Sequence, residues 1–127
     1  MKTLQEHLTE ALMTEARKRF KEFKTIDDCV KVIDSMFKDW KNGKYKKELA
    51  DVNFDAKLFM DSLISGAKAY DAPNPEKAAL AYMNDVVNGD DQWEDVFIDG
   101  GEDNNYDEVA IADIIAPQFD DEYYKNL

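Results

Sequence analysis

The spacing of apolar residues is the feature that most constrains how this chain folds. Apolar side chains recur every three or four residues along several stretches, which gathers them on one side of an α-helix. The longest stretch, residues 3–23, begins with Thr3 and Glu6 in the arrangement of a capping box. Four basic residues lie near its end, where they suit the helix dipole. We predict that residues 3–23 form the longest helix.

The same spacing predicts two further helices in the first seventy residues. Thr25 is an expected N-cap, followed by two acids in the first turn, and Gly43 is an expected end. A basic bend at residues 44–47 follows. Residues 53–70 then continue the helical spacing, although Gly66 lies inside that stretch. The single cysteine falls on the apolar side of the first of these helices, where we expect it to pack as a small hydrophobe.

A fourth helix is predicted after a turn at residues 71–76. Asn74 is the expected N-cap, and Pro75 occupies the first helical position, where a missing N–H costs nothing. Gly89 closes the stretch. Beyond it, residues 93–98 read as a short strand or an extended segment, and residues 99–101 read as a turn.

The last part of the chain predicts one more helix and a final turn. Asn104 or Asn105 is the expected cap, Pro117 the expected stop, and residues 120–124 the final turn. Hydrophobic residues make up 44% of the chain and aromatic residues 12%, which is enough apolar material for one packed core. We predict a mainly α fold: a single domain over residues 1–127 with four to five helices and an irregular acidic C-terminal third.

Charge is unequally divided along the chain. Residues 1–50 carry 12 basic and 9 acidic side chains, whereas residues 51–127 carry 4 basic and 19 acidic ones. Between Lys77 and Lys125 there is no Lys or Arg, and 14 carboxylates fall in that interval. Such a surface repels nucleic-acid phosphates and attracts basic proteins. We predict a protein partner with a basic surface, and no direct binding to nucleic acid.

We expect the acids after Lys77 to form one exposed face that binds this partner. Helix capping accounts for part of them, but not for the absence of compensating cations. An array of carboxylates also resembles the charge of a nucleic-acid backbone, so nucleic-acid mimicry is a possible mode of binding. Tyr106, Tyr123 and Tyr124 are candidate anchors, as is Trp93, for which core packing is favoured. The predicted binding residues are Asp90, Asp91, Glu94, Asp95, Asp99, Glu102, Asp103, Asp107, Glu108, Asp120, Asp121 and Glu122.

No pattern of catalytic residues or cofactor ligands is found. The only histidine is His7, no serine lies in a Gly-x-Ser-x-Gly turn, and no glycine pattern that binds phosphate occurs. Residues 103–107 space oxygen ligands as a calcium loop does, but Glu108 replaces the turn glycine and Ile114 the bidentate glutamate. We predict no enzyme, no cofactor and no metal site.

The chain has no predicted membrane segment. Its longest apolar run, residues 78–83, is far shorter than the ~20 residues that cross a bilayer. Glu6, Glu10 and Glu15 lie where a signal peptide is apolar. We therefore expect no membrane partner.

The first eleven residues, Met-Lys-Thr-Leu-Gln-Glu-His-Leu-Thr-Glu-Ala, resemble the leader of internal head proteins of large tailed phages. In that family the leader takes a protein into the assembling head, and a protease cuts after a Glu that follows a Leu or Ile by two residues. Leu8, Thr9 and Glu10 are similar to such a site, so the resemblance implies a cut between Glu10 and Ala11. Internal head proteins are often basic, and this chain departs from them in that respect.

These observations predict a non-catalytic, phage-type accessory protein that binds a basic partner through its acidic C-terminal face. The alternative is a virion structural protein or a packaged internal protein without mimicry. A divalent-metal-binding protein is the second alternative. The expected location is the cytoplasm of a host cell or the virion.

Overall fold

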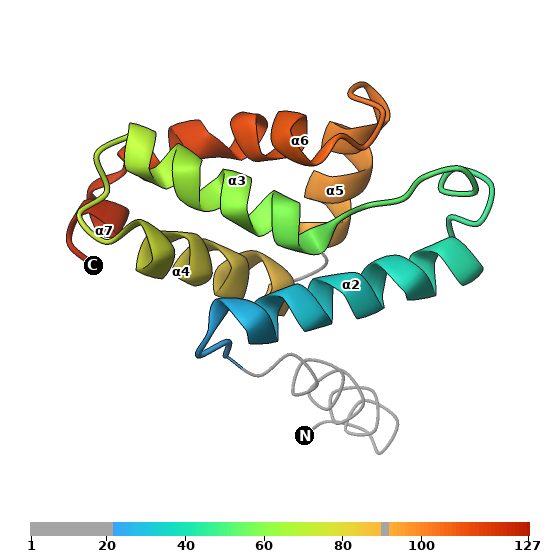
Figure 1. The fold of residues 1–127 in the computed structure, drawn as a ribbon, viewed down its shortest axis with the longest axis horizontal. Helices are drawn as coiled ribbons and strands as arrows, with labels where there is room; N and C mark the ends of the chain where they lie inside the picture. The colour runs from blue at the N-terminus through green and yellow to red at the C-terminus, as the bar shows by residue number, and fades with distance from the viewer. Residues whose placement is uncertain (1–21, 90–91) are drawn as a thin grey trace, which may run out of the picture.

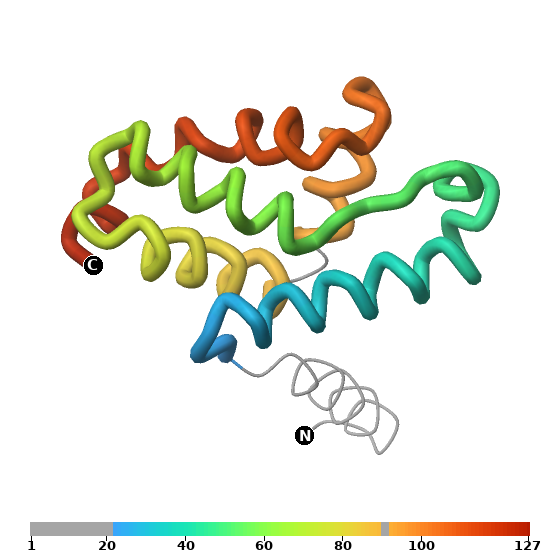
Figure 2. The backbone as a smooth tube through the Cα atoms, viewed as in Figure 1, coloured from blue at the N-terminus to red at the C-terminus, as the bar shows by residue number. Residues whose placement is uncertain are grey.

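A computed structural model describes residues 22–89 and 92–127 of the chain, shown as a ribbon in Figure 1 and as a backbone tube in Figure 2. Those residues form helices and connecting turns and contain no strand, so the prediction of a mainly α fold is confirmed. The elements are α2 (Ile26–Asn42), α3 (Ala56–Ala69), α4 (Pro75–Asn88), α5 (Gln92–Glu102), α6 (Glu108–Ile115), the 3₁₀-helix η1 (Ala116–Asp120) and α7 (Glu122–Lys125).

Side-chain caps explain where four of the helices begin. The side chains of Thr25 and Asn74 accept hydrogen bonds from the backbone N–H three residues later, as the sequence predicted for α2 and α4. Asp55 does the same for α3, and Asp107 for α6. Each cap satisfies one of the N–H groups that a helix start leaves unpaired.

Helix α3 is the centre of the fold. It packs against α2, α4, α6 and η1, and Figure 1 shows it lying between α6 and α4. Phe59, Met60 and Leu63 on α3 are completely buried. The glycine that weakened the prediction of this helix, Gly66, has a packing role: a Cβ at this position would lie 2.9 Å from the Cβ of Ala116 in η1. The close approach of η1 to α3 therefore requires a glycine there.

The prediction of a strand or extended segment at residues 93–98 is wrong, because these residues belong to helix α5. Trp93, Phe97 and Gly101 are spaced four residues apart and form the buried side of that helix. The predicted turn at residues 99–101 is also wrong, since Gly100 and Gly101 complete the helix. A Cβ at Gly101 would lie 2.4 Å from the ring of Tyr106, so this glycine makes room for an aromatic ring.

The chain turns after α5 instead, with Asn105 and Tyr106 in the left-handed region at φ values of 54° and 55°. The prediction that Asn104 or Asn105 caps the next helix is wrong, because Asp107 caps α6. The side chain of Asn104 instead donates to the carbonyl of Gly100, at 2.8 Å, and so closes the end of α5. The turn brings the Tyr106 ring back onto Phe97, with 5.4 Å between the ring centroids.

The C-terminal third of the chain is helical, and its predicted irregular character is therefore wrong. The predicted stop at Pro117 is confirmed, because α6 ends at Ile115; Pro117 itself lies in the first turn of η1, where proline is tolerated. Asp121 then caps the short helix α7. Four elements from α5 to α7 thus succeed one another with only short connections.

The predicted helix over residues 3–23 lies outside the described residues, apart from Glu22 and Phe23, and neither of those two is helical. Phe23 is buried and anchored to α4. Its N–H donates to Asn84 Oδ1 at 2.6 Å, and Asn84 Nδ2 donates to its carbonyl at 3.3 Å.

Cys29 packs as the small hydrophobe that the sequence predicted. It is completely buried, with its Sγ 3.9 Å from the Sδ of Met60, and burial raises the pKa of its thiol to about 12. A single hydrophobic cluster connects α2 with all the later helices of the described ranges. None of the helices described is long and apolar enough to cross a membrane.

Candidate acidic interface

Four of the predicted binding residues form a stripe on the solvent side of α5. Asp95, Asp99 and Glu102 are exposed and, at 100° per residue, fall within an arc of about 60° of the helix; Asp103 is exposed in the turn directly after it. This arc is opposite the buried side formed by Trp93 and its neighbours. No hydrogen bond or ion pair with another described residue engages their side chains. We call these four residues the α5 stripe.

Glu94 lies beside the stripe, but its carboxylate is hydrogen-bonded to residues from the first half of the chain. Its carboxylate accepts a 2.7 Å hydrogen bond from Lys44 Nζ and a second, short one from the hydroxyl of Tyr45. Partial burial acts to raise the pKa of Glu94, but the hydrogen bonds and the positive charge of Lys44 together lower it. The bend predicted to be basic therefore pairs with one acid of the C-terminal half.

Four other predicted residues have structural partners. Asp107 and Asp121 cap helices, accepting from Ala110 N at 2.9 Å and from Tyr123 N at 2.8 Å respectively. Glu108 accepts from the backbone N–H of Asp55 at 2.8 Å, which links the starts of α6 and α3.

The last of these four is Asp120, which forms an ion pair with Lys125 at 2.7 Å. Glu122 is exposed and has no side-chain partner among the described residues. Asp90 and Asp91 lie outside the described residues, as do His7, Glu10 and Ala11.

The predicted acids form two groups rather than one face. Figure 1 shows α5 near one end of α6 and α7 near the other, so the α5 stripe and the acids of residues 120–122 lie at opposite ends of α6. Sequence position could not reveal this separation, because α6 and η1 carry the chain from one end to the other.

Two apolar residues on α6 are exposed. Val109 is 44% exposed and Ile114 is 51% exposed. A Cβ at Gly100 would lie 3.7 Å from Cδ1 of Ile114, which places this side chain against the end of α5. Helix α6 has six apolar residues among its eight, and their spacing alone did not tell which of them face solvent.

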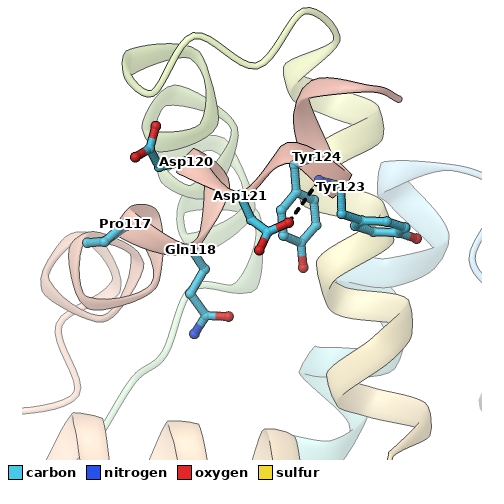
Figure 3. A pocket seen from close by; sticks show the side chains of 6 residues that line it. All are labelled: Pro117, Gln118, Asp120, Asp121, Tyr123 and Tyr124. Atoms are coloured by element: carbon cyan, nitrogen blue, oxygen red, sulfur yellow. Dashed lines mark hydrogen bonds between the residues drawn. The ribbon is translucent and has the colours of Figure 1, made fainter.

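A concave site lies at the other end of α6, where η1 meets α7. Its cavity volume is about 570 Å³, and Figure 3 shows the six side chains that line it. We call it the C-terminal pocket. The lining residues are Pro117, Gln118, Asp120, Asp121, Tyr123 and Tyr124.

Aromatic rings lead from the core to this pocket. Tyr82 contacts Phe119, Phe119 contacts Tyr124, and Tyr124 contacts Tyr123, each pair in an edge-to-face arrangement. Tyr82 and Phe119 are buried, whereas Tyr123 is 52% exposed. Of the four predicted aromatic anchors, Tyr123 alone is exposed; Trp93, Tyr106 and Tyr124 are buried.

Among the described residues, no group of three or more His, Cys, Asp or Glu side chains is arranged to hold a metal ion. The calcium-like stretch at residues 103–107 is instead the left-handed turn and helix cap described above. Comparisons of the chain with protein-family models, with curated proteins and with solved structures find no match.

Proposed function

We propose that this protein is a non-catalytic binding protein whose acidic C-terminal half engages a protein partner with a basic surface. The observation that carries the proposal is the α5 stripe: three carboxylates on one side of a helix and a fourth in the turn after it, all exposed and none engaged by a described residue. An ordinary helical surface mixes both signs of charge, whereas α5 carries no cation of its own. The nearby cations are Lys44, which pairs with Glu94, and Lys47, which lines a pocket together with Glu102.

The charge density of the stripe supports mimicry of a nucleic acid as the mode of binding. At the helical rise per residue, the chain advances about 12 Å from Asp95 to Asp103, so the four charges lie on average about 4 Å apart along the axis. One strand of DNA presents a charge about every 3.4 Å. A cleft of Lys and Arg that accepts a nucleic-acid strand would therefore meet a similar density of charge.

The helix that carries the stripe is firmly held, which reduces the entropic cost of binding. Trp93 and Phe97 anchor α5 in the core, and Glu94 ties its start to Lys44 and Tyr45. The exposed Ile114 lies beside the end of the helix and offers apolar contact next to the charges.

We place this activity in a phage setting because of the leader-like sequence of residues 1–11. Packaging as an internal or structural virion protein is the alternative. It predicts that protein recovered from particles begins at Ala11, which N-terminal sequencing or mass spectrometry would detect. A divalent-metal-binding protein predicts a rise in melting temperature with calcium or magnesium.

A salt-dependent pull-down tests the proposal. Wild-type protein should capture a basic protein from infected lysate at low salt and release it as the salt concentration rises, because exposed charges are screened. A variant with Asp95→Asn, Asp99→Asn, Glu102→Gln and Asp103→Asn should lose most of this capture.

The matched control is Asp27→Asn, Asp39→Asn, Asp71→Asn and Glu76→Gln, which removes four exposed acids that also have no described partner. It should bind like the wild type. If both variants lost capture equally, binding would depend on the net charge of the protein and not on the α5 stripe. Capture that persists at high salt would contradict an electrostatic interface.

A further inference from the structure

The C-terminal pocket has features that the α5 stripe lacks: it is concave, and aromatic rings form part of its wall. The rings of Tyr123 and Tyr124 meet at an interplanar angle of 78° with 5.0 Å between centroids. They form a corner, one ring of which is half exposed. Aromatic faces attract cations, and Arg stacks on them most readily.

Tyr124 contributes an unused polar group to this pocket. Its side chain is only 8% exposed, and its hydroxyl has no hydrogen-bond partner among the described residues. The hydroxyl itself is reached by solvent, since Trp93 Nε1 is the one buried side-chain polar atom without a partner among the described residues. The pKa of Tyr124 is raised to about 12 by burial and by nearby negative charges, so the hydroxyl stays protonated at neutral pH. A ligand in the pocket would take the place of solvent at this hydroxyl.

The charge at the pocket comes from Asp121. Its Oδ1 accepts from Tyr123 N, which leaves the second carboxylate oxygen available. Asp120 is already paired with Lys125. Figure 3 shows Asp120 pointing away from the other lining side chains, whereas Gln118, Asp121 and Tyr124 extend to the same side. In this view a carboxylate, an amide and a hydroxyl therefore lie on one side of the pocket.

We propose that the C-terminal pocket binds an arginine side chain. A guanidinium carries five N–H donors in one plane, which suits the acceptors of Asp121, Gln118 and Tyr124 together, while its face stacks on the Tyr123 ring. A lysine ammonium is a compact charge and makes less use of this arrangement. The inference rests on the proposed function, because the arginine would belong to the same basic partner, engaged at the other end of α6.

A small probe tests the pocket without the partner. An acetylated and amidated Gly-Arg-Gly tripeptide is titrated into the isotopically labelled full-length protein, and the NMR signals of residues 118–124 are followed. We expect saturable shifts confined to those residues and their aromatic neighbours. The citrulline tripeptide has nearly the same shape without the charge and should cause no saturable shift. Equal shifts with both tripeptides, or none with the arginine one, would overturn the inference.

Three substitutions assign the contacts. Asp121→Asn keeps an acceptor for the cap and removes the charge, so the tripeptide should bind roughly tenfold more weakly. Tyr123→Leu, at an exposed position, should weaken binding about three- to fivefold by removing the cation–π contact. Tyr124→Phe should weaken it roughly threefold through the lost hydrogen bond.

Asp99→Asn is the control, since it removes the same charge from the α5 stripe and should leave tripeptide binding unchanged. If Asp99→Asn weakened binding as much as Asp121→Asn, the tripeptide would be attracted by the net charge of the protein and not bound in the C-terminal pocket. The pocket and the proposed function fail separately. Tripeptide binding without a captured partner would refute only the proposed function, and capture without tripeptide binding would refute only the pocket.

Discussion

The two ends of α6 use the same kind of residue in different ways. At the α5 end, four carboxylates stand free of described partners on an ordinary helical surface. At the η1–α7 end, one acid caps a helix and another is paired with Lys125, yet the surface there is concave and partly aromatic. Acidic residues close together in sequence therefore differ in how they can bind a partner. The stripe presents a high density of charge, whereas the pocket presents a concave surface.

The largest expected effect comes from detaching α5 and with it the stripe. Trp93 is 1% exposed and packs against Phe59 and Phe97, so Trp93→Ala should lower the free energy of unfolding by about 3–5 kcal/mol. Its indole N–H is buried without a partner. Trp93→Phe gives up no hydrogen bond and should therefore cost clearly less. Urea denaturation of both variants measures the difference, and equal losses would show that the indole N–H is in fact satisfied.

A smaller effect is expected at the end of α5, where two adjacent glycines differ. Gly101→Ala forces a Cβ into the Tyr106 ring and should destabilise the protein by about 1–3 kcal/mol. Gly100→Ala meets only Ile114, at ordinary contact distance, and should be neutral or stabilising by up to about 1 kcal/mol. Thermal melts of the pair provide the comparison. A reversed order would mean that the turn after α5 is not packed as described.

Acids that cap helices should be more important for stability than acids of the stripe. Asp107→Ala removes the cap of α6 and should cost about 1 kcal/mol, while Asp107→Asn should cost little, because asparagine caps equally well. Asp103→Ala is the comparison from the stripe and should change stability by less than about 0.5 kcal/mol. If Asp103→Ala lowered the free energy of unfolding as much as Asp107→Ala, acids that cap helices could not be distinguished from acids of the stripe by their contribution to stability.

The smallest effect is expected for the Glu94 link to the basic bend. Its pKa is lowered in the folded state, so the link stabilises the protein above the unfolded pKa of a glutamate and is lost as the pH falls through the folded value. Because Lys44 is exposed, Glu94→Gln should cost at most about 1 kcal/mol at neutral pH. The difference from wild type should disappear in acid. Denaturation midpoints measured across this pH range test it, and a difference that persists below the folded pKa would exclude the ion pair as its origin.

Several features could be predicted from local sequence because local chemistry decides them. Thr25 and Asn74 cap their helices as expected, since a cap depends on neighbours within one turn. The mainly α fold follows from apolar spacing that only a helix can gather on one side. Cys29 could be placed in the core for the same reason.

Other features depended on residues far away in sequence or space. The pair Gly100-Gly101 is typical of a turn, and only the ring of Tyr106 packed against Gly101 explains why it ends a helix. Val109 and Ile114 have the same spacing as core residues, and their exposure depends on which side of α6 meets α3. The partners of Glu94 lie about fifty residues earlier in the chain.

The sequence by itself determined the helical character of the fold, the starts of α2 and α4, and the concentration of acid after Lys77, because each is a property of composition or of near neighbours. Only the tertiary structure decided which acids remain available. That outcome depends on where α6 and η1 carry the chain, which divides the predicted face into a stripe on α5 and a pocket at η1–α7. The direction of α6 and η1 is set by their packing against α3, which is a contact between residues far apart in the sequence.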